Sequence, residues 1–275
     1  ESGRWRIRAD LERTDPSFLR RLIGLEDARF GDHPGVDALA VARAAGSAMV
    51  RGHIVSGAST LTMQTARLLQ PHPRNFGGKL IEMVRAVQIE ARLSKRQILG
   101  LYLTLAPYGG NLEGVRSASL AYFGHEPTTL TPGEQALLIA LPQSPEARRP
   151  DRHPAAARAA RDRVLTRLAR AHLMDAEDAR EATTEPMPHR SAFPTLAWHA
   201  AGQLAARAPA DQASVVTTLD AGLQARLERL AAQTAAAQGP QTTVAIMVVR
   251  VRDRAVRAMV GSAGLERPGG WLDMT

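Results

Sequence analysis

The 275-residue sequence contains no cysteine, which excludes disulfides and thiolate metal sites and leaves the redox compartment open. Aromatic residues make up only 4% of the chain, so few rings are available for stacking single-stranded nucleic acid. No apolar run approaches the ~20 residues that a membrane-spanning helix needs. These shortages disfavour a disulfide scaffold, a nucleic-acid partner and a membrane span within these residues.

Arginine is the most common charged residue, and the chain as a whole is basic. Lys and Arg number 35 against 27 Asp and Glu, for a formal net charge of +8. This excess suits a phosphorylated substrate or an anionic bilayer surface, and no basic segment with interleaved aromatics favours nucleic acid. The hydrophobic share of 44% is that of a globular protein, with length for one large domain or slightly more.

Two adjacent carboxylates close an expected helix near the N-terminus. Asp15 and Pro16 form a helix-start signature, and apolar residues then repeat at helical spacing as far as Glu26. We expect the helix to present Glu26 and Asp27 at its end. On local grounds alone, the acidic pair also fits a solvated helix end.

A second run, Ser56 to Gln64, begins thirty residues after Glu26 and is rich in hydroxyl and amide groups. Such a segment suits a wall that hydrogen-bonds a polar substrate. A pair such as Ser59 and Thr60 also caps helices in many proteins, so that interpretation stays open.

Five segments resemble the motifs of a known family. In order they are Glu26 to Gly35, Ser56 to Gln64, Gly78 to Glu82, Ser94 to Leu103 and Ala106 to Val115. The chain resembles the lysozyme-like family 51 peptidoglycan glycosyltransferases of class A penicillin-binding proteins, and Leu-Thr-Met-Gln at residues 61–64 is similar to the 1C type. The resemblance implies a mainly α, lysozyme-like glycosyltransferase domain followed by a small α+β fragment, the start of a transpeptidase domain.

The expected domain order is glycosyltransferase over residues 1–173, linker over 174–213 and transpeptidase fragment over 214–275. Ser94 with Gln97 and Thr131 with Glu134 are capping boxes that start helices. An Ala- and Arg-rich helix is expected from Ala155 to Leu173, and the run Glu185 to Pro188 breaks the helical pattern.

The last part of the chain predicts a helix and a hairpin. Asp220 caps a helix with leucines 223, 227 and 230 on one face, and Gly239 and Pro240 end it. Residues 243–251 and 255–260 then predict two strands joined by a polar turn, with residues 244–249 as a buried strand.

Covalent penicillin chemistry is not expected of these residues. The only lysines are Lys79 and Lys95, and the residues three positions before them are Phe76 and Arg92. Neither Ser-x-x-Lys nor Lys-Thr-Gly therefore occurs.

The resemblance implies that Glu26 is the catalytic base for the 4-hydroxyl of the acceptor sugar on lipid II, with Asp27 in support. It also implies that Lys79 meets the donor pyrophosphate and that Glu82 is a second essential glutamate. From spacing alone, Lys79 and Glu82 also fit an exposed ion pair worth ~0.2 to 0.5 kcal/mol. Residues 80, 84, 87 and 91 are expected to form the buried stripe of the same helix.

Further substrate-binding candidates are Asp27, Ser59, Thr60, Gln64, Arg67, Phe30 and His33. A diphosphate leaving group carries spread negative charge, which Arg67 can help to neutralise, although it also fits a surface arginine. Phe30 is expected to pack beside the glutamate. His33, before the Pro34-Gly35 turn, is expected to stabilise that turn rather than carry a proton.

Four positions depart from the common family pattern. Ala58 replaces a glycine, as is typical of the 1C type. Gly78 stands where many members have arginine, which removes a phosphate contact. Gly100 and Thr104 replace a glutamate and an asparagine, and weaker helix packing is expected there.

No cofactor bound by a protein motif is expected, because no His, Asp and Glu cluster has metal-ligand spacing. The resemblance allows a divalent cation such as Mg²⁺ to accompany the substrate pyrophosphate. It implies as partners lipid II, the growing glycan chain, the bacterial cytoplasmic membrane surface and other cell wall synthesis proteins, with no nucleic acid.

The implied location is the outer, periplasmic face of the inner membrane. The chain starts with Glu1 and not Met, so we expect a piece of a longer protein whose membrane anchor precedes it. Residues 36–55 are the expected interfacial loop. The arginines of residues 148–170 form either a solvated helix face or a contact with anionic lipid, at ~1 kcal/mol each.

Two other functions remain open. A lysozyme-like hydrolase or lytic transglycosylase also uses a catalytic glutamate in a helical fold, but it has no diphosphate to neutralise. A scaffold or lipid II-binding module without activity is the non-enzymatic alternative.

Overall fold

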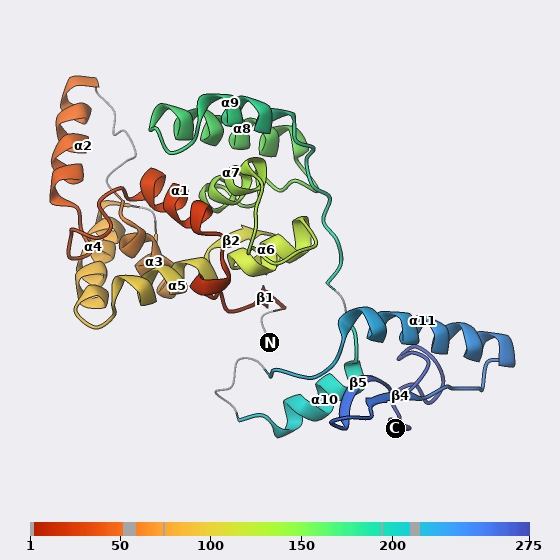
Figure 1. Ribbon diagram of the computed structural model, residues 1–275. Helices are drawn as coiled ribbons and strands as arrows, with labels where there is room; N and C mark the ends of the chain where they lie inside the picture. Colours follow the sequence, from red (N-terminus) through yellow and green to blue (C-terminus); the bar gives the residue numbers. More distant parts are fainter. Residues whose placement is uncertain (1–2, 52–58, 74, 194, 210–214) are drawn as a thin grey trace. The chain divides into compact units, whose positions relative to one another are not determined.

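The computed structural model describes residues 3–51, 59–73, 75–193, 195–209 and 215–275. Contacts divide the chain into two compact units, Glu1–Ala192 and Phe193–Thr275 (Figure 1). Both are rich in helix, which confirms the expected mainly α class. Among the described residues, no helix has the length and apolar character needed to cross a membrane.

The first unit combines helices with one small sheet. Its elements are β1 (Trp5–Arg6), η1 (Leu11–Arg13), α1 (Pro16–Glu26), α2 (Ala38–Arg51), α3 (Leu61–Leu69), α4 (Phe76–Glu90), α5 (Lys95–Leu105), β2 (Pro107–Gly109), β3 (Leu112–Glu113), α6 (Val115–Tyr122), α7 (Pro132–Ala140), η2 (Leu141–Gln143), α8 (Pro154–Arg170), α9 (Ala176–Glu181) and η3 (Ala182–Thr184). The sheet order is β1-β3-β2, with β1 parallel and β2 antiparallel to β3.

The core of the first unit lies around α7, whose side chains are buried from Gln135 to Ala140. Helix α7 packs against α8, while α3 packs against both α4 and α5. The predicted capping boxes at Ser94 and Thr131 both form, as do the side-chain caps by Asp15 and Asp175. Local signals therefore set where these helices begin.

The predicted buried stripe of α4 is wrong. Leu80, Val84 and Val87 are 56%, 51% and 48% exposed, whereas Gly78, Glu82 and Ala86 are buried. The helix is rotated so that its polar stripe faces α3 and the apolar one faces outward. This rotation is possible because basic side chains of α3 and α4 surround the Glu82 carboxylate.

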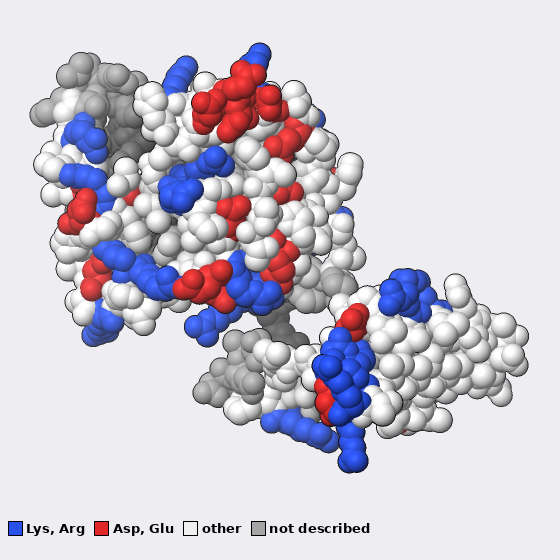
Figure 2. Space-filling model, viewed as in Figure 1, with Lys and Arg blue, Asp and Glu red and all other residues white. Residues whose placement is uncertain are grey.

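Charges of both signs are mixed over the face of the first unit seen in Figure 2. Most arginines of α8 are exposed, which agrees with the interpretation of these arginines as a solvated helix face. Arg161 is an exception, because its buried guanidinium donates to the carbonyls of Thr183 and Glu185 at 2.6 Å.

The expected linker, residues 174–213, is divided between the two units. Helix α9 and η3 pack on α8, and Ser191 N–H donates to the Ala121 carbonyl at 2.8 Å. The first unit thus continues to Ala192, beyond the expected end at residue 173.

The second unit contains α10 (Trp198–Arg207), α11 (Ala221–Gln238) and the hairpin of β4 (Ile246–Arg250) and β5 (Ala255–Val260). Asp220 caps α11 and Gly239 ends it, as predicted. The predicted leucine face is only half-buried. Gln224 docks the helix instead, because its side chain both donates to and accepts from the backbone of Met259 at 2.8 Å. Strand β4 is not fully buried either, since Met247 and Val249 are partly exposed.

Candidate active site

Glu26 is the last residue of α1, and its half-buried carboxylate is held by two amides. Gln64 Nε2, from α3, donates to Oε2 at 3.1 Å, and Gln143 Nε2, from η2, donates to Oε1 at 3.0 Å. Each oxygen therefore has one donor from a different element. This arrangement sets the direction of the carboxylate.

Arg148 determines how the Gln143 amide is oriented. Its Nη1 lies 2.7 Å from the Ala140 carbonyl and 3.2 Å from Gln143 Oε1. A guanidinium only donates hydrogen bonds, so the amide oxygen faces Arg148 and the NH₂ group faces Glu26. Sequence reasoning missed Gln143 because it lies 117 residues from Glu26.

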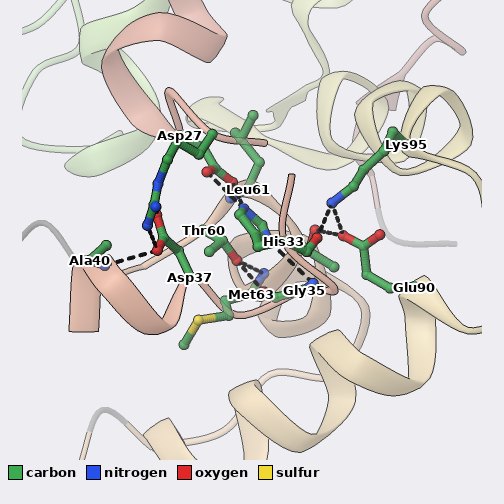
Figure 3. A network of polar contacts seen from close by, with 12 residues as sticks. Asp27, His33, Gly35, Asp37, Ala40, Thr60, Leu61, Met63, Glu90 and Lys95 are labelled. Atoms are coloured by element: carbon green, nitrogen blue, oxygen red, sulfur yellow. Dashed lines mark hydrogen bonds and ion pairs between the residues drawn. The ribbon is translucent and has the colours of Figure 1, made fainter. Parts of the chain in front are cut away.

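Asp27 lies at the centre of a buried network (Figure 3). Its carboxylate accepts Leu61 N–H at 2.9 Å and lies 2.9 Å from His33 Nε2. Gly35 N–H donates to His33 Nδ1 at 3.2 Å, so Nε2 carries the hydrogen that Asp27 accepts. The network joins the end of α1 to the start of α3.

Lys95 extends this network from α5. Its Nζ donates to the His33 carbonyl at 2.6 Å and to Glu90 at 2.7 Å (Figure 3). The same Nζ lies 4.7 Å from the centre of the Phe30 ring. Phe30 and His33 are both buried. Their side chains therefore support the loop that carries the acidic pair.

Ser59 and Thr60 have different surroundings. Thr60 is buried, donates to the Gly35 carbonyl at 2.6 Å and accepts Met63 N–H at 3.1 Å, so it is the N-cap of α3. Ser59 is half-buried and accepts from Lys79 Nζ at 2.5 Å. The capping alternative therefore applies to Thr60, while Ser59 lies among the predicted site residues.

Basic side chains gather round the Glu82 carboxylate. Lys79 Nζ lies 2.7 Å from Oε2, Arg67 Nη1 lies 3.3 Å from Oε1, and His72 Nε2 lies 3.4 Å from Oε1. The carboxylate and the His72 ring are largely buried, whereas Lys79 and Arg67 remain partly exposed. The ion pair predicted from spacing is thus one part of a larger cationic cluster.

Helix α3 links Glu26 to the cationic cluster around Glu82. Gln64 contacts Glu26, and Arg67, one turn later, contacts Glu82. Three residues advance a helix by about 4.5 Å, so the base candidate and the cationic cluster lie along one helix face. A cavity of about 700 Å³ lies on the Glu26 side of this arrangement and is lined by Glu26, Ser59 and, among others, Arg43 of α2; neither Gln64 nor the side chains of the cationic cluster line it.

Tyr102 of α5 is a further neighbour of Glu26. Burial raises the pKa of Tyr102 well above its usual value, and the negative charge of Glu26 adds to the shift. The phenol therefore stays neutral at physiological pH. Sequence reasoning did not name Tyr102 as a site residue, although it lies within the motif from Ser94 to Leu103, which is the signal that could have found it.

Other site predictions lie partly outside the described residues. Ser56, Gly57 and Ala58 are among these, as are residues 52–55 of the expected interfacial loop. The described part of that loop includes α2. Among the described residues, no group of three or more His, Asp or Glu side chains is placed to hold a metal ion.

This geometry coincides with the region that a known family model covers. The model described as Transglycosylase matches residues 1–169, and the chain belongs to the transglycosylase family.

Among individual proteins, the chain is 45% identical to penicillin-binding protein 1C of Escherichia coli strain K12 over 266 residues. That alignment covers 96% of this chain and 34% of that protein. Penicillin-binding protein 1A of the same organism is 38% identical over 165 residues, which are 59% of this chain and 19% of that protein.

The chain thus spans about a third of the length of penicillin-binding protein 1C, and less of the other relative. A crystal structure of penicillin-binding protein 1A from Haemophilus influenzae aligns with a TM-score of 0.34 and 22% identity, over 63% of this chain and 25% of that one. That likeness is too weak to support the fold assignment.

Proposed function

We propose that this chain is a peptidoglycan glycosyltransferase that polymerises lipid II into β-1,4-linked glycan strands and releases undecaprenyl diphosphate. The observation that carries the proposal is the pairing of Glu26 with a cationic cluster along α3. Gln64 holds the glutamate, and Arg67 joins Lys79 at the Glu82 carboxylate.

Glu26 is the proposed general base. One carboxylate oxygen accepts the proton of the acceptor 4-hydroxyl while the hydroxyl oxygen attacks the anomeric carbon of the donor sugar. The bond between that carbon and the diphosphate oxygen breaks with inversion, and its electron pair leaves with the diphosphate. Lys79 and Arg67 neutralise the charge that develops there. A divalent cation accompanying the pyrophosphate would supply further neutralisation.

A glycan-cleaving activity fits the same residues less well. Inverting and retaining glycosidases both need a second carboxylate beside the bond that is cleaved. Asp27 is the obvious candidate, but its carboxylate is buried and bonded to Leu61 N–H and His33. Cleavage between sugars also has no use for the cations at Glu82.

A lipid-linked substrate requires contact with the membrane surface, and exposed apolar side chains of α4 support this contact. Phe76, Leu80 and Val84 are all exposed, although apolar. We propose that they enter the interface of the cytoplasmic membrane on its outer side. Co-sedimentation with anionic vesicles that is unchanged in a Leu80→Ser, Val84→Ser double variant would contradict this placement.

Glu26→Gln tests the mechanism. The amide cannot accept the hydroxyl proton, so the rate of polymerisation of labelled lipid II should fall at least ~100-fold. The matched control is Glu177→Gln, an exposed residue of α9. Thermal unfolding should show both variants folded. The proposal would be refuted if wild type makes no glycan polymer, or if folded Glu26→Gln is fully active. Wild type that binds lipid II without polymerising it would favour the scaffold alternative.

A further inference from the structure

Gly78 faces the loop that precedes α4. A Cβ on residue 78 would lie 2.1 Å from the Pro73 carbonyl oxygen and 2.7 Å from His72 Cδ2. Real Cβ atoms do not approach other atoms this closely, so any other residue would displace His72 and Pro73. The space that an arginine at position 78 would need is occupied by His72 and Pro73.

The glycine therefore brings an imidazole to the cationic cluster. The His72 side chain is 10% exposed, and its Nε2 lies 3.4 Å from Glu82 Oε1. Sequence reasoning treated Gly78 only as the loss of a phosphate contact. In the structure, the loop that this glycine admits supplies a different titratable group.

The hydrogen bonds of His72 restrict where its protons lie. Nδ1 is 2.9 Å from the Gln70 carbonyl, which only accepts, so Nδ1 carries a hydrogen. Nε2 is buried and has no hydrogen-bond partner among the described residues. Without a proton, its lone pair would face a carboxylate oxygen. A proton on Nε2 turns the same contact into a charge-assisted attraction.

The groups around His72 determine the net charge that a diphosphate would meet here. Glu82 faces His72 from α4 and the Gln70 carbonyl faces it from the end of α3, while Lys79 and Arg67 share the Glu82 carboxylate with it. Among the described side chains of the cluster, Arg67 and Lys79 exceed Glu82 by one positive charge. An imidazolium raises the excess to two, which matches a diphosphate diester with one negative charge on each phosphate.

We propose that His72 is a positioning residue of the diphosphate site. The charge of a protonated Nε2 attracts Glu82 Oε1, 3.4 Å away, so Arg67 is free to turn from the carboxylate to the diphosphate. His72 thereby substitutes for an arginine at position 78. The identity of the anion rests on the function proposed above, whereas the charge arrangement is taken from the contacts in this structure.

Binding of inorganic pyrophosphate, measured by calorimetry on the 275-residue chain, tests the proposal. His72→Ala and His72→Gln should weaken binding about 10- to 100-fold, the range for a hydrogen bond to a charged group. His72→Lys, which keeps a cation, should stay within about threefold of wild type. The matched control is His153→Ala, an exposed histidine whose side chain makes no capping bond to α8.

The same variants should separate the steps of polymerisation. His72→Ala should raise KM for lipid II by a similar factor and change kcat less, because Glu26 is untouched. Gly78→Ala should displace the loop and reproduce the loss, and the double variant should lose no more than either single one.

Unchanged pyrophosphate affinity in folded His72→Ala would overturn the proposal. So would His72→Lys binding as weakly as His72→Ala, because the role would then be packing and not charge. A wild-type chain that binds pyrophosphate through His72 yet makes no glycan polymer would contradict the proposed function and support this inference.

Discussion

Two amide side chains decide how the Glu26 carboxylate is presented. Gln64 lies in a motif that the sequence identifies, but Gln143 comes from η2, far along the chain. Because Arg148 fixes the orientation of its amide, Gln143 acts as a dedicated donor to Glu26.

Gln143→Met should lower kcat for lipid II polymerisation about tenfold, since it removes a hydrogen bond to a charged group and keeps the side-chain length. KM should change little because Gln143 is not among the phosphate contacts. Initial rates over a range of lipid II concentrations would measure this. Gln233→Met, an exposed position of α11, is the control. An unchanged kcat would mean that Gln64 alone orients the base.

Residues within motifs were the predictable ones. The quoted segments contain Glu26, Lys79 and Glu82, and the structure places Lys79 and Glu82 together in one cluster. His72 and Gln143 were missed because nothing in their local sequence indicates their partners. The predicted roles of Asp27, Phe30 and His33 in binding substrate stay predictions, and their buried side chains favour positioning.

At the scale of elements, helix starts follow from local chemistry. Asp15 caps α1 with Oδ1, and its Oδ2 accepts Leu130 N–H at 2.9 Å from a distant loop. Burial alone would raise the pKa of Asp15, but hydrogen bonds from the Ser17 hydroxyl and from Leu130 and neighbouring N–H groups outweigh it and lower the pKa.

Asp15→Asn should destabilise the fold by about 1–3 kcal/mol at pH 7, because an amide NH₂ would face Leu130 N–H or the helix start. The native contribution is present above the unfolded value of 3.8 and is lost as pH falls through the lower folded pKa. The difference from wild type in urea unfolding should therefore shrink below that pH. Asp175→Asn is the control, since Asn caps as well as Asp. A difference that persists at low pH would contradict the linkage.

Helical periodicity could not decide which face of α4 is buried. The sequence shows one apolar and one polar stripe, and the usual preference would bury the apolar one. Glu82 is buried instead because Lys79 and Arg67 pair with it. Pairing across helices has no signature in either helix alone.

At the scale of the whole molecule, the first unit is closed by residues beyond its expected end. The Glu185 carboxylate accepts Gly133 N–H at 2.9 Å and the Thr131 hydroxyl at 2.5 Å, while buried Arg161 donates to two carbonyls of the same segment. The first two bonds cap the start of α7, and the other two supply acceptors for the buried Arg161 guanidinium of α8.

A fragment of residues 1–192 should fold, whereas residues 1–173 should be less stable by about 3 kcal/mol or more. The shorter fragment leaves the Arg161 guanidinium without two of its acceptors, at about 1.5–3 kcal/mol for each hydrogen bond to a charged group. Urea unfolding of both fragments measures the difference. Equal stability of the two fragments would mean that the first unit ends at residue 173, as the sequence predicted.

The sequence by itself determined the helix starts, the mainly α class and the motifs that contain Glu26, Lys79 and Glu82, because capping and periodicity act over a few residues. The tertiary structure alone decided that α4 turns its charged stripe inward, that Gln143 reaches Glu26 and that Gly78 admits His72. Each of these depends on a group that a distant or differently directed segment supplies. Short-range patterns in the chain carry no information about such partners.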